Sequence, residues 1–146
     1  MYFDEDRIRI GVRVQDWREA VQVVGELLVG CGGAEKRYIE AMIQTVEDLG
    51  PYIVITPGIA IPHARPEAGA LKLKLAAIQL EPPIEFGNPD NDPVSLVIAF
   101  SSPDKEAHLE ALVTLARKFA REGFLKDVQK AHTSKQLAAL LNHKDE

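Results

Sequence analysis

The sequence predicts a single α/β domain: one observation supports the α/β class and a second supports the single domain. Along the chain, stretches in which apolar and polar residues alternate, as in strands, are interleaved with stretches whose apolar residues recur every three or four positions, as in helices. The chain has 146 residues, of which 46% are hydrophobic and 27% are charged. This length and composition fit one well-buried domain and are too small for two. We therefore expect a single domain over residues 1–146.

The first predicted elements are a half-buried strand and two helices. The alternation over 8–14 places one set of apolar side chains on a single face of a strand. Asp16 is a suitable N-cap for the helix that follows, and the glycines of 31–33 end that helix. A second helix over about 35–49 stops at Gly50 and Pro51. The apolar residues of the strand are Ile8, Ile10, Val12 and Val14; those of the helices are Ala20, Val23, Val24, Leu27 and Leu28, then Tyr38, Met42, Ile43 and Val46.

Four extended segments are predicted in the middle of the chain. Residues 52–55 and 58–61 are short apolar runs. Residues 71–80 begin with alternating leucines and lysines, which is typical of a strand with one solvent-exposed face. Residues 94–100 are apolar almost throughout and predict a central, buried strand. The leucines expected on the buried face of the third segment are Leu71, Leu73 and Leu75.

Between these strands, 81–93 is rich in Pro, Gly, Asn and Asp, and is predicted to be an exposed loop. Its residues Asp90, Asn91 and Asp92 are interpreted as turn formers, since they lack the ligand spacing and terminal Glu of a calcium loop.

The remainder of the chain is predicted to be helical. Ser102 followed by Pro103 indicates a helix N-terminus, and this helix extends to about Arg121. Two shorter helices are expected near 124–130 and 134–142. The residues of the first helix that are expected to face the core are Leu112, Leu115 and Phe119.

The composition argues against several classes of protein. With 17 Lys and Arg against 22 Asp and Glu, the net charge is −5, and no basic run offers a surface to nucleic acid. The single cysteine, Cys31, excludes an internal disulfide and has no basic neighbour in sequence to activate its thiol. No stretch approaches the roughly 20 apolar residues that span a bilayer, and the acidic start lacks the apolar core of a secretion signal. We expect a cytoplasmic protein without direct membrane insertion.

Two of the four histidines have settings that indicate a site. His63 follows an apolar strand and Pro62, which cannot continue a central strand, so its imidazole is expected near a strand end. His108 lies early in the helix after the 94–100 strand, on the same stripe as its core-facing residues. If the strands before the two histidines are parallel neighbours, both imidazoles reach the same end of the sheet. The alternative for each is a structural histidine held by backbone carbonyls; His132 and His143 are interpreted as surface residues.

The sequence lacks the usual markers of several enzyme classes. It contains neither of the two glycine-rich phosphate-binding motifs, G-x-x-x-x-G-K and G-x-G-x-x-G. It also lacks an H-E-x-x-H pair and a G-x-S-x-G elbow. Two histidines could bind a metal ion, but a third ligand is not clearly placed. A neutral imidazole is also a competent nucleophile for phosphoryl transfer, which needs positioning and hydrogen-bond donors. In that case His63 would carry the phosphoryl group, while His108 and the nearby Arg65 could donate to its oxygens. The alternative for Arg65 is a solvent-exposed surface arginine with no such role.

Three motifs in matching order resemble the enzyme IIA component of the bacterial sugar phosphotransferase system. They are PGIAIPHARPE (57–67), FGNPDNDPVSLVIAFSSPD (86–104) and HLEALVTLA (108–116). The similarity runs from about Tyr38 to Leu141. The mannitol/fructose type, and within it the ascorbate-type proteins, is the most similar group.

This resemblance implies a mixed β-sheet flanked by helices on both faces, and no metal, nucleotide or other cofactor. It implies that His63 accepts phosphate from the histidine-containing phosphocarrier protein and passes it to a cysteine of enzyme IIB, which serves the membrane component enzyme IIC. His108 matches the second histidine of the family, which hydrogen-bonds the active-site imidazole or its phosphoryl group. The ascorbate-like subgroup suggests ascorbate as the transported carbohydrate.

The sequence departs from the family pattern in the second helix. Mannitol-type members carry an Arg there that assists the transfer, whereas 42–47 (MIQTVE) contains none and Thr45 falls at or near its position. Arg65, in the H-A-R-P-E continuation that ascorbate-type proteins share, is the expected source of the missing charge. A protein that transfers phosphate less readily is the alternative.

The sequence leaves other functions open. A domain of this kind can also be a phosphorylation-dependent regulatory module, although a chain with no DNA-binding or membrane segment attached suits a transport relay better. The two histidines could instead coordinate a metal ion. Partner proteins are expected to dock on an apolar surface around His63, to which Ile59, Ile61 and the 81–93 loop could contribute; for the two strand residues, a place in the core is the alternative. The oligomeric state is not predicted.

Overall fold

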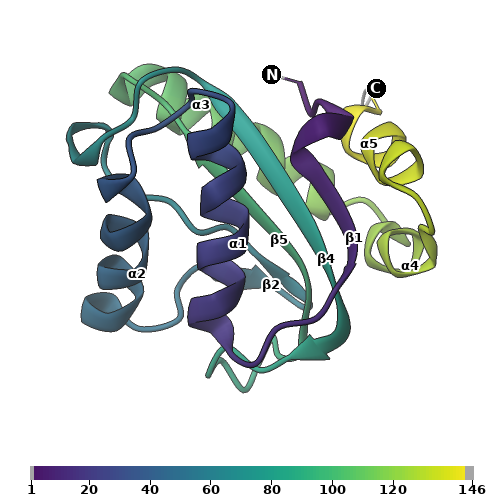
Figure 1. The fold of residues 1–146 in the computed structure, drawn as a ribbon. Coiled ribbons are helices and arrows are strands. Elements are labelled where there is room, and N and C mark those ends of the chain that lie inside the picture. The colour runs from purple at the N-terminus through teal and green to yellow at the C-terminus, as the bar shows by residue number, and fades with distance from the viewer. Residues whose placement is uncertain (1, 144–146) are drawn as a thin grey trace.

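The strands form one five-stranded sheet in the order β1-β4-β5-β3-β2 (Figure 1). The computed structural model describes residues 2–143, so the outermost positions of the predicted domain, 1 and 144–146, lie outside the described residues. β1 pairs with β4, and β3 with β5, in parallel; β4–β5 and β2–β3 are antiparallel, so the sheet is mixed. The strands are β1 (Ile8–Val12), β2 (Val54–Thr56), β3 (Ile59–Ala60), β4 (Lys74–Ile84) and β5 (Val94–Ser101).

Helices cover both faces of this sheet, as predicted (Figure 1). Alternate residues of the central strands point to opposite faces: Ala76 and Ile78 of β4 pack with α1 and α2, whereas Leu75 and Ala77 pack with α3, α4 and α5. No helix within residues 2–143 is both long and apolar enough to cross a membrane. The helices are α1 (Trp17–Gly30), α2 (Arg37–Leu49), α3 (Lys105–Phe119), α4 (Phe124–Lys130) and α5 (Ser134–Asn142).

The first strand differs from the prediction in the side that its apolar residues face. Ile8 and Ile10 pack on the α3–α5 side, but Val12 and Val14 pack on the α1–α2 side. The change occurs at Gly11, whose φ of 63° is accessible to glycine and interrupts the regular alternation. The pairing with β4 shifts register at the same place.

The boundaries of β4 were also predicted wrongly. Leu71 and Leu73 are exposed and precede the strand, because the backbone there is bound elsewhere: the N–H groups of Leu71 and Lys72 donate to the carbonyl of Gly33 at 2.9 and 3.1 Å. At its other end, β4 continues through 81–84, which was predicted to be loop. Pairing with β1 ends at Leu80, so the prolines that follow interrupt no ladder bond on that side.

The rest of the predicted loop is a turn organised by Asp92. Its carboxylate accepts hydrogen bonds from the backbone N–H groups of Phe86, Gly87 and Asn88 at 2.9–3.0 Å. The Asn91 side chain donates to the carbonyl of Val54 at 2.8 Å, which attaches the turn to β2. These contacts agree with a turn-forming role.

The C-terminal helices follow the prediction closely, except at the ends of α3. The N-cap of α3 is Asp104, whose carboxylate accepts from the N–H of Ala107 at 2.8 Å, and not Ser102. Ser102 is buried, and its hydroxyl donates to the carbonyl of Asp104. The helix ends at Phe119 and not near Arg121, whereas α4 and α5 have the predicted limits.

Candidate functional site

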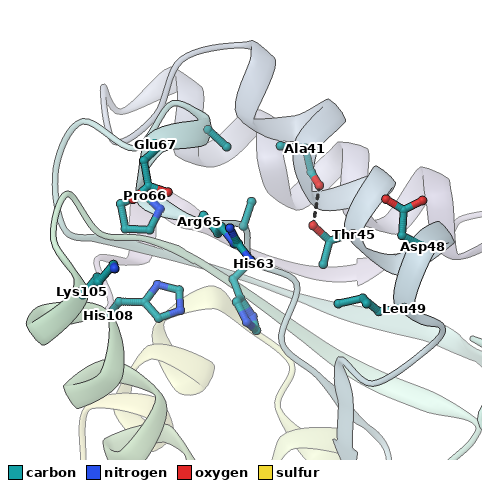
Figure 2. A pocket seen from close by; sticks show the side chains of 12 residues that line it. Ala41, Thr45, Asp48, Leu49, His63, Arg65, Pro66, Glu67, Lys105 and His108 are labelled. Atoms are coloured by element: carbon teal, nitrogen blue, oxygen red, sulfur yellow. Dashed lines mark hydrogen bonds between the residues drawn. The ribbon is translucent and has the colours of Figure 1, made fainter.

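The sheet brings His63 and His108 to the same end of two neighbouring strands. β3 and β5 are parallel, with Ile59 beside Leu96 and Ala60 beside Val97. His63 comes shortly after β3, and His108 lies in the helix after β5. Their ring centroids are 5.3 Å apart with the planes at 68°, so the edge of one ring faces the other (Figure 2). The predicted convergence of the two imidazoles is confirmed.

The backbone just before His63 determines which ring nitrogen is available. The Nδ1 of His63 lies 2.8 Å from the carbonyl oxygen of Ile61. A carbonyl only accepts hydrogen bonds, so Nδ1 must carry the proton of the neutral ring. Nε2 then has a free lone pair. This bond selects a single nucleophilic nitrogen.

The His63 ring stacks on Phe100, and its burial keeps it neutral. The two rings stack, with centroids 5.3 Å apart and planes at 26°. Phe100 is the penultimate residue of β5 and is fully buried. Burial lowers the pKa of His63 below the usual histidine value, and the neighbouring His108 lowers it further, while the bond to Ile61 acts in the opposite direction. Near neutral pH the imidazole is therefore neutral, with its single proton on Nδ1.

His108 presents its other nitrogen to the site. Its ring packs 5.0 Å from that of Phe100, and its Nδ1 is buried with no hydrogen-bond partner within residues 2–143. Burying an unpaired N–H is costly, so the proton belongs on Nε2, which is then available as a donor in the pocket. Burial also lowers the pKa of His108, which keeps this ring neutral.

The two histidines line an open pocket of about 980 Å³ between α2, the loop after β3 and the start of α3 (Figure 2). Two cationic residues line it as well, Arg65 and Lys105, and neither pairs with a carboxylate within the described residues. Arg65 was predicted, and its side chain is exposed at the rim. Lys105 was missed, although its position one helical turn before His108 is a signal that could have identified it. Two acidic residues, Asp48 and Glu67, complete the charged lining.

Comparison with known proteins identifies the family. The sequence matches the family described as "Phosphoenolpyruvate-dependent sugar phosphotransferase system, EIIA 2" over residues 1–144. The chain belongs to this family. It is an enzyme IIA, a phosphocarrier component of the phosphotransferase system that works through a phosphohistidine.

Relatives of this enzyme IIA agree in sequence and fold. The ascorbate-specific EIIA component of Escherichia coli K12 is 35% identical over 136 residues, which cover 92% of this chain and 88% of that protein. The solution structure of the mannitol-specific cryptic enzyme IIA from Escherichia coli has a TM-score of 0.85 at 34% identity, covering 96% and 95% of the two chains. The complex of the mannitol enzyme IIA with phosphorylated enzyme IIB, also from Escherichia coli, contains a similar chain, with a TM-score of 0.85, 26% identity and coverages of 95% and 96%.

In this enzyme IIA, the pocket face of α2 carries no cation. Its pocket-lining residues are Ala41, Thr45, Asp48 and Leu49. Thr45 thus lies in the pocket, as the comparison of motifs suggested, and its hydroxyl donates to the carbonyl of Ala41 at 2.8 Å (Figure 2). The two cations that line the pocket, Arg65 and Lys105, come instead from the loop after β3 and from the start of α3.

Other residues considered in the sequence lie away from this pocket. His132 and His143 are exposed, and Cys31 is half-buried with its thiol directed at the carbonyl of Leu28. Within residues 2–143, no three or more His, Cys, Asp or Glu side chains form a group that could hold a metal ion. For Ile59 and Ile61, the alternative of a place in the core is confirmed over a docking surface, because both are fully buried between the sheet and α3–α5.

Proposed function

We propose that this enzyme IIA carries its phosphoryl group on Nε2 of His63, taking it from the histidine-containing phosphocarrier protein and giving it to a cysteine of enzyme IIB. The observation that carries this proposal is the bond from His63 Nδ1 to the Ile61 carbonyl, which leaves Nε2 as the free nucleophile. The solved complex of a similar enzyme IIA with phosphorylated enzyme IIB supports the choice of acceptor.

The first transfer is an in-line displacement at phosphorus. The Nε2 lone pair of His63 forms the new N–P bond, while the N–P bond of the donor breaks and its electron pair returns to the donor imidazole. His63 keeps the proton on Nδ1, so its ring becomes positively charged, and the Ile61 carbonyl stabilises that charge. In the second transfer, a thiolate of enzyme IIB attacks the same phosphorus, and the electrons of the His63 N–P bond return to Nε2.

His108 and Arg65 are proposed to stabilise the phosphoryl oxygens during these steps. The Nε2–H of His108 is the pocket donor that its buried Nδ1 leaves available. Arg65 supplies positive charge, in the absence of an α2 arginine, and Lys105 lines the same pocket. Donors that are fixed before the reaction stabilise the charge of the transition state without reorganising.

We expect the phosphate to be found on Nε2 of His63 when the protein is incubated with phosphoenolpyruvate and the general proteins of the system. Tryptic mapping under conditions that preserve acid-labile phosphoramidates identifies the residue, and ³¹P NMR distinguishes Nε2 from Nδ1 phosphohistidine. Phosphate on Nδ1, or on any other residue, would contradict the assignment.

Replacing Arg65 by glutamine should slow phosphate acceptance by about 10-fold or more, since a charge-assisted hydrogen bond contributes about 1.5–3 kcal/mol. Stopped-flow or quenched measurements of the first transfer provide the rate. The exposed Arg117 of α3, outside the pocket, offers the matched control Arg117→Gln, for which we expect the wild-type rate. If Lys105→Gln slows the reaction and Arg65→Gln does not, the cation has been assigned to the wrong residue.

Partner proteins are proposed to dock over the pocket mouth on apolar side chains other than those expected from the sequence. Leu49 lines the pocket and is 61% exposed. Leu109 directly follows His108 and is 63% exposed. Such side chains at the rim of a polar site are typical of an interaction surface.

The cellular setting is proposed from the family. We propose that this domain acts in the cytoplasm, where phosphoenolpyruvate is a metabolite, and that its acceptor enzyme IIB serves the membrane component enzyme IIC; membership of the phosphoenolpyruvate-dependent family supports this. Ascorbate is the proposed carbohydrate, on the basis of the curated relatives named for it.

A further inference from the structure

Tyr38 lies in the first turn of α2, beneath the loop that carries His63. Its side chain is only 1% exposed and belongs to the apolar core between the sheet and helices α1 and α2. Core packing accounts for the aromatic ring. It does not account for the hydroxyl group, which is costly to bury unless it is hydrogen-bonded.

The hydroxyl of Tyr38 forms hydrogen bonds with two backbone segments, one at Ala64 and one at Phe100. It accepts a hydrogen bond from the N–H of Ala64 at 3.1 Å. Its proton has two carbonyl acceptors, that of Phe100 at 3.0 Å and that of Ala64 at 3.1 Å. Burial raises the pKa of Tyr38, so the hydroxyl stays protonated and remains a donor.

These two segments are the ones that carry the stacked rings of the site. Ala64 directly follows His63, and Phe100 is the residue on whose ring the His63 imidazole stacks. The pairing of β3 with β5 ends at Ala60 and Val97, so no ladder bond holds His63 to β5. The Tyr38 hydroxyl therefore provides the link between the histidine loop and the end of β5.

We propose that Tyr38 is a positioning residue for phosphoryl transfer, whose hydroxyl holds the His63 imidazole on Phe100 with Nε2 directed into the pocket. This inference rests on the proposed role of His63. A displacement of about 1 Å in a reacting group can reduce a rate by as much as 10²-fold. The tyrosine does not line the pocket, so it acts on the reaction only through the position of His63.

The variant Tyr38→Phe tests this role because it removes only the oxygen atom. We expect the maximal rate of phosphate acceptance to fall about 10-fold or more, with no change in the donor concentration that gives half the maximal rate. In ¹⁵N NMR spectra of the unphosphorylated protein, the His63 ring should change from the Nδ1–H tautomer to a mixture of tautomers. A purely structural role would alter neither the tautomer nor the maximal rate of the folded protein.

Gln79 offers a matched control outside the pocket. It is buried, and its side chain also makes three hydrogen bonds to the backbone, with Gly11, Val128 and Ala131. Gln79→Leu should lower the melting temperature but leave the rate and the His63 tautomer unchanged. Equal loss of rate in the two variants, or a wild-type rate and tautomer in Tyr38→Phe, would overturn the proposal.

If Tyr38→Phe does not fold, hydrogen exchange of the wild-type protein tests whether the Tyr38 hydroxyl holds the histidine loop. The Ala64 amide donates to the buried hydroxyl and should exchange as slowly as the amides of β5; exchange as fast as in an exposed loop would overturn the proposal. If wild-type protein accepts no phosphate on His63, the proposed function fails. The tautomer and the exchange rate still report on Tyr38, because both are measured without phosphate.

Discussion

Replacing His63 by glutamine should abolish phosphate acceptance. Glutamine is polar and of similar size, but its amide nitrogen has no basic lone pair with which to displace the donor imidazole. The measurement is transfer of label from radioactive phosphoenolpyruvate through the general phosphotransfer proteins.

In the wild-type protein, acceptance should persist as the pH falls through the range where an exposed histidine takes up a proton, because burial lowers the pKa of His63 and keeps Nε2 free. The same labelling assay, run over a series of pH values, measures this.

The control for the His63→Gln labelling experiment is His132→Gln. His132 is exposed and lies outside the pocket, so this variant should accept label as the wild type does. Circular dichroism and thermal melting confirm that both variants are folded. Undiminished labelling of His63→Gln would remove the proposed phosphorylation site.

The second large effect is expected from His108→Ala, in the transfer from enzyme IIA to enzyme IIB. Removing one fixed donor to a developing charge typically costs about 10²–10³-fold in rate. We expect the onward transfer to slow by about 10²-fold, while the fold and much of the acceptance are retained. The measurement starts from the phosphorylated enzyme IIA, isolated from the donor proteins, and follows the loss of label to the enzyme IIB cysteine.

His108→Gln separates hydrogen bonding from packing in this step, since its amide can still donate to the phosphoryl oxygens. It should transfer phosphate faster than His108→Ala. Wild-type transfer by the alanine variant would show that His108 is only a packing residue. If the wild-type protein holds its phosphate and transfers none to any thiol, the domain is a regulatory module and not a relay.

The placement of the two histidines could be predicted because each is tied to a recognisable element. Pro62 ends the strand before His63, and the apolar run of β5 leads directly into the helix of His108. The sequence did not show that β3 and β5 are parallel neighbours, so the convergence of the two histidines was predicted on the condition that they are. The resemblance also singled out Arg65 as a candidate cation and placed Thr45 at or near the position of the missing arginine, and both residues line the pocket.

Features that depend on backbone conformation or on distant partners could not be predicted in this way. Alternating polarity does not show that Gly11 adopts a positive φ and reverses the strand faces. Nor does it show which hydrogen bonds a buried tyrosine makes. The Tyr38 partners Ala64 and Phe100 lie 26 and 62 positions away in sequence, and the apolar stripe of α2 predicts only that its ring is buried.

The Ile61 carbonyl occupies one ring nitrogen of His63, so if His63 carries the phosphoryl group as proposed, the donor and the acceptor proteins both use the other nitrogen. Each approaches the phosphorus through the same mouth of the pocket, so the two cannot be bound at once. The relay is then a ping-pong cycle in which one partner dissociates before the next arrives. On this mechanism, unphosphorylated donor and enzyme IIB compete for the same mouth of the pocket.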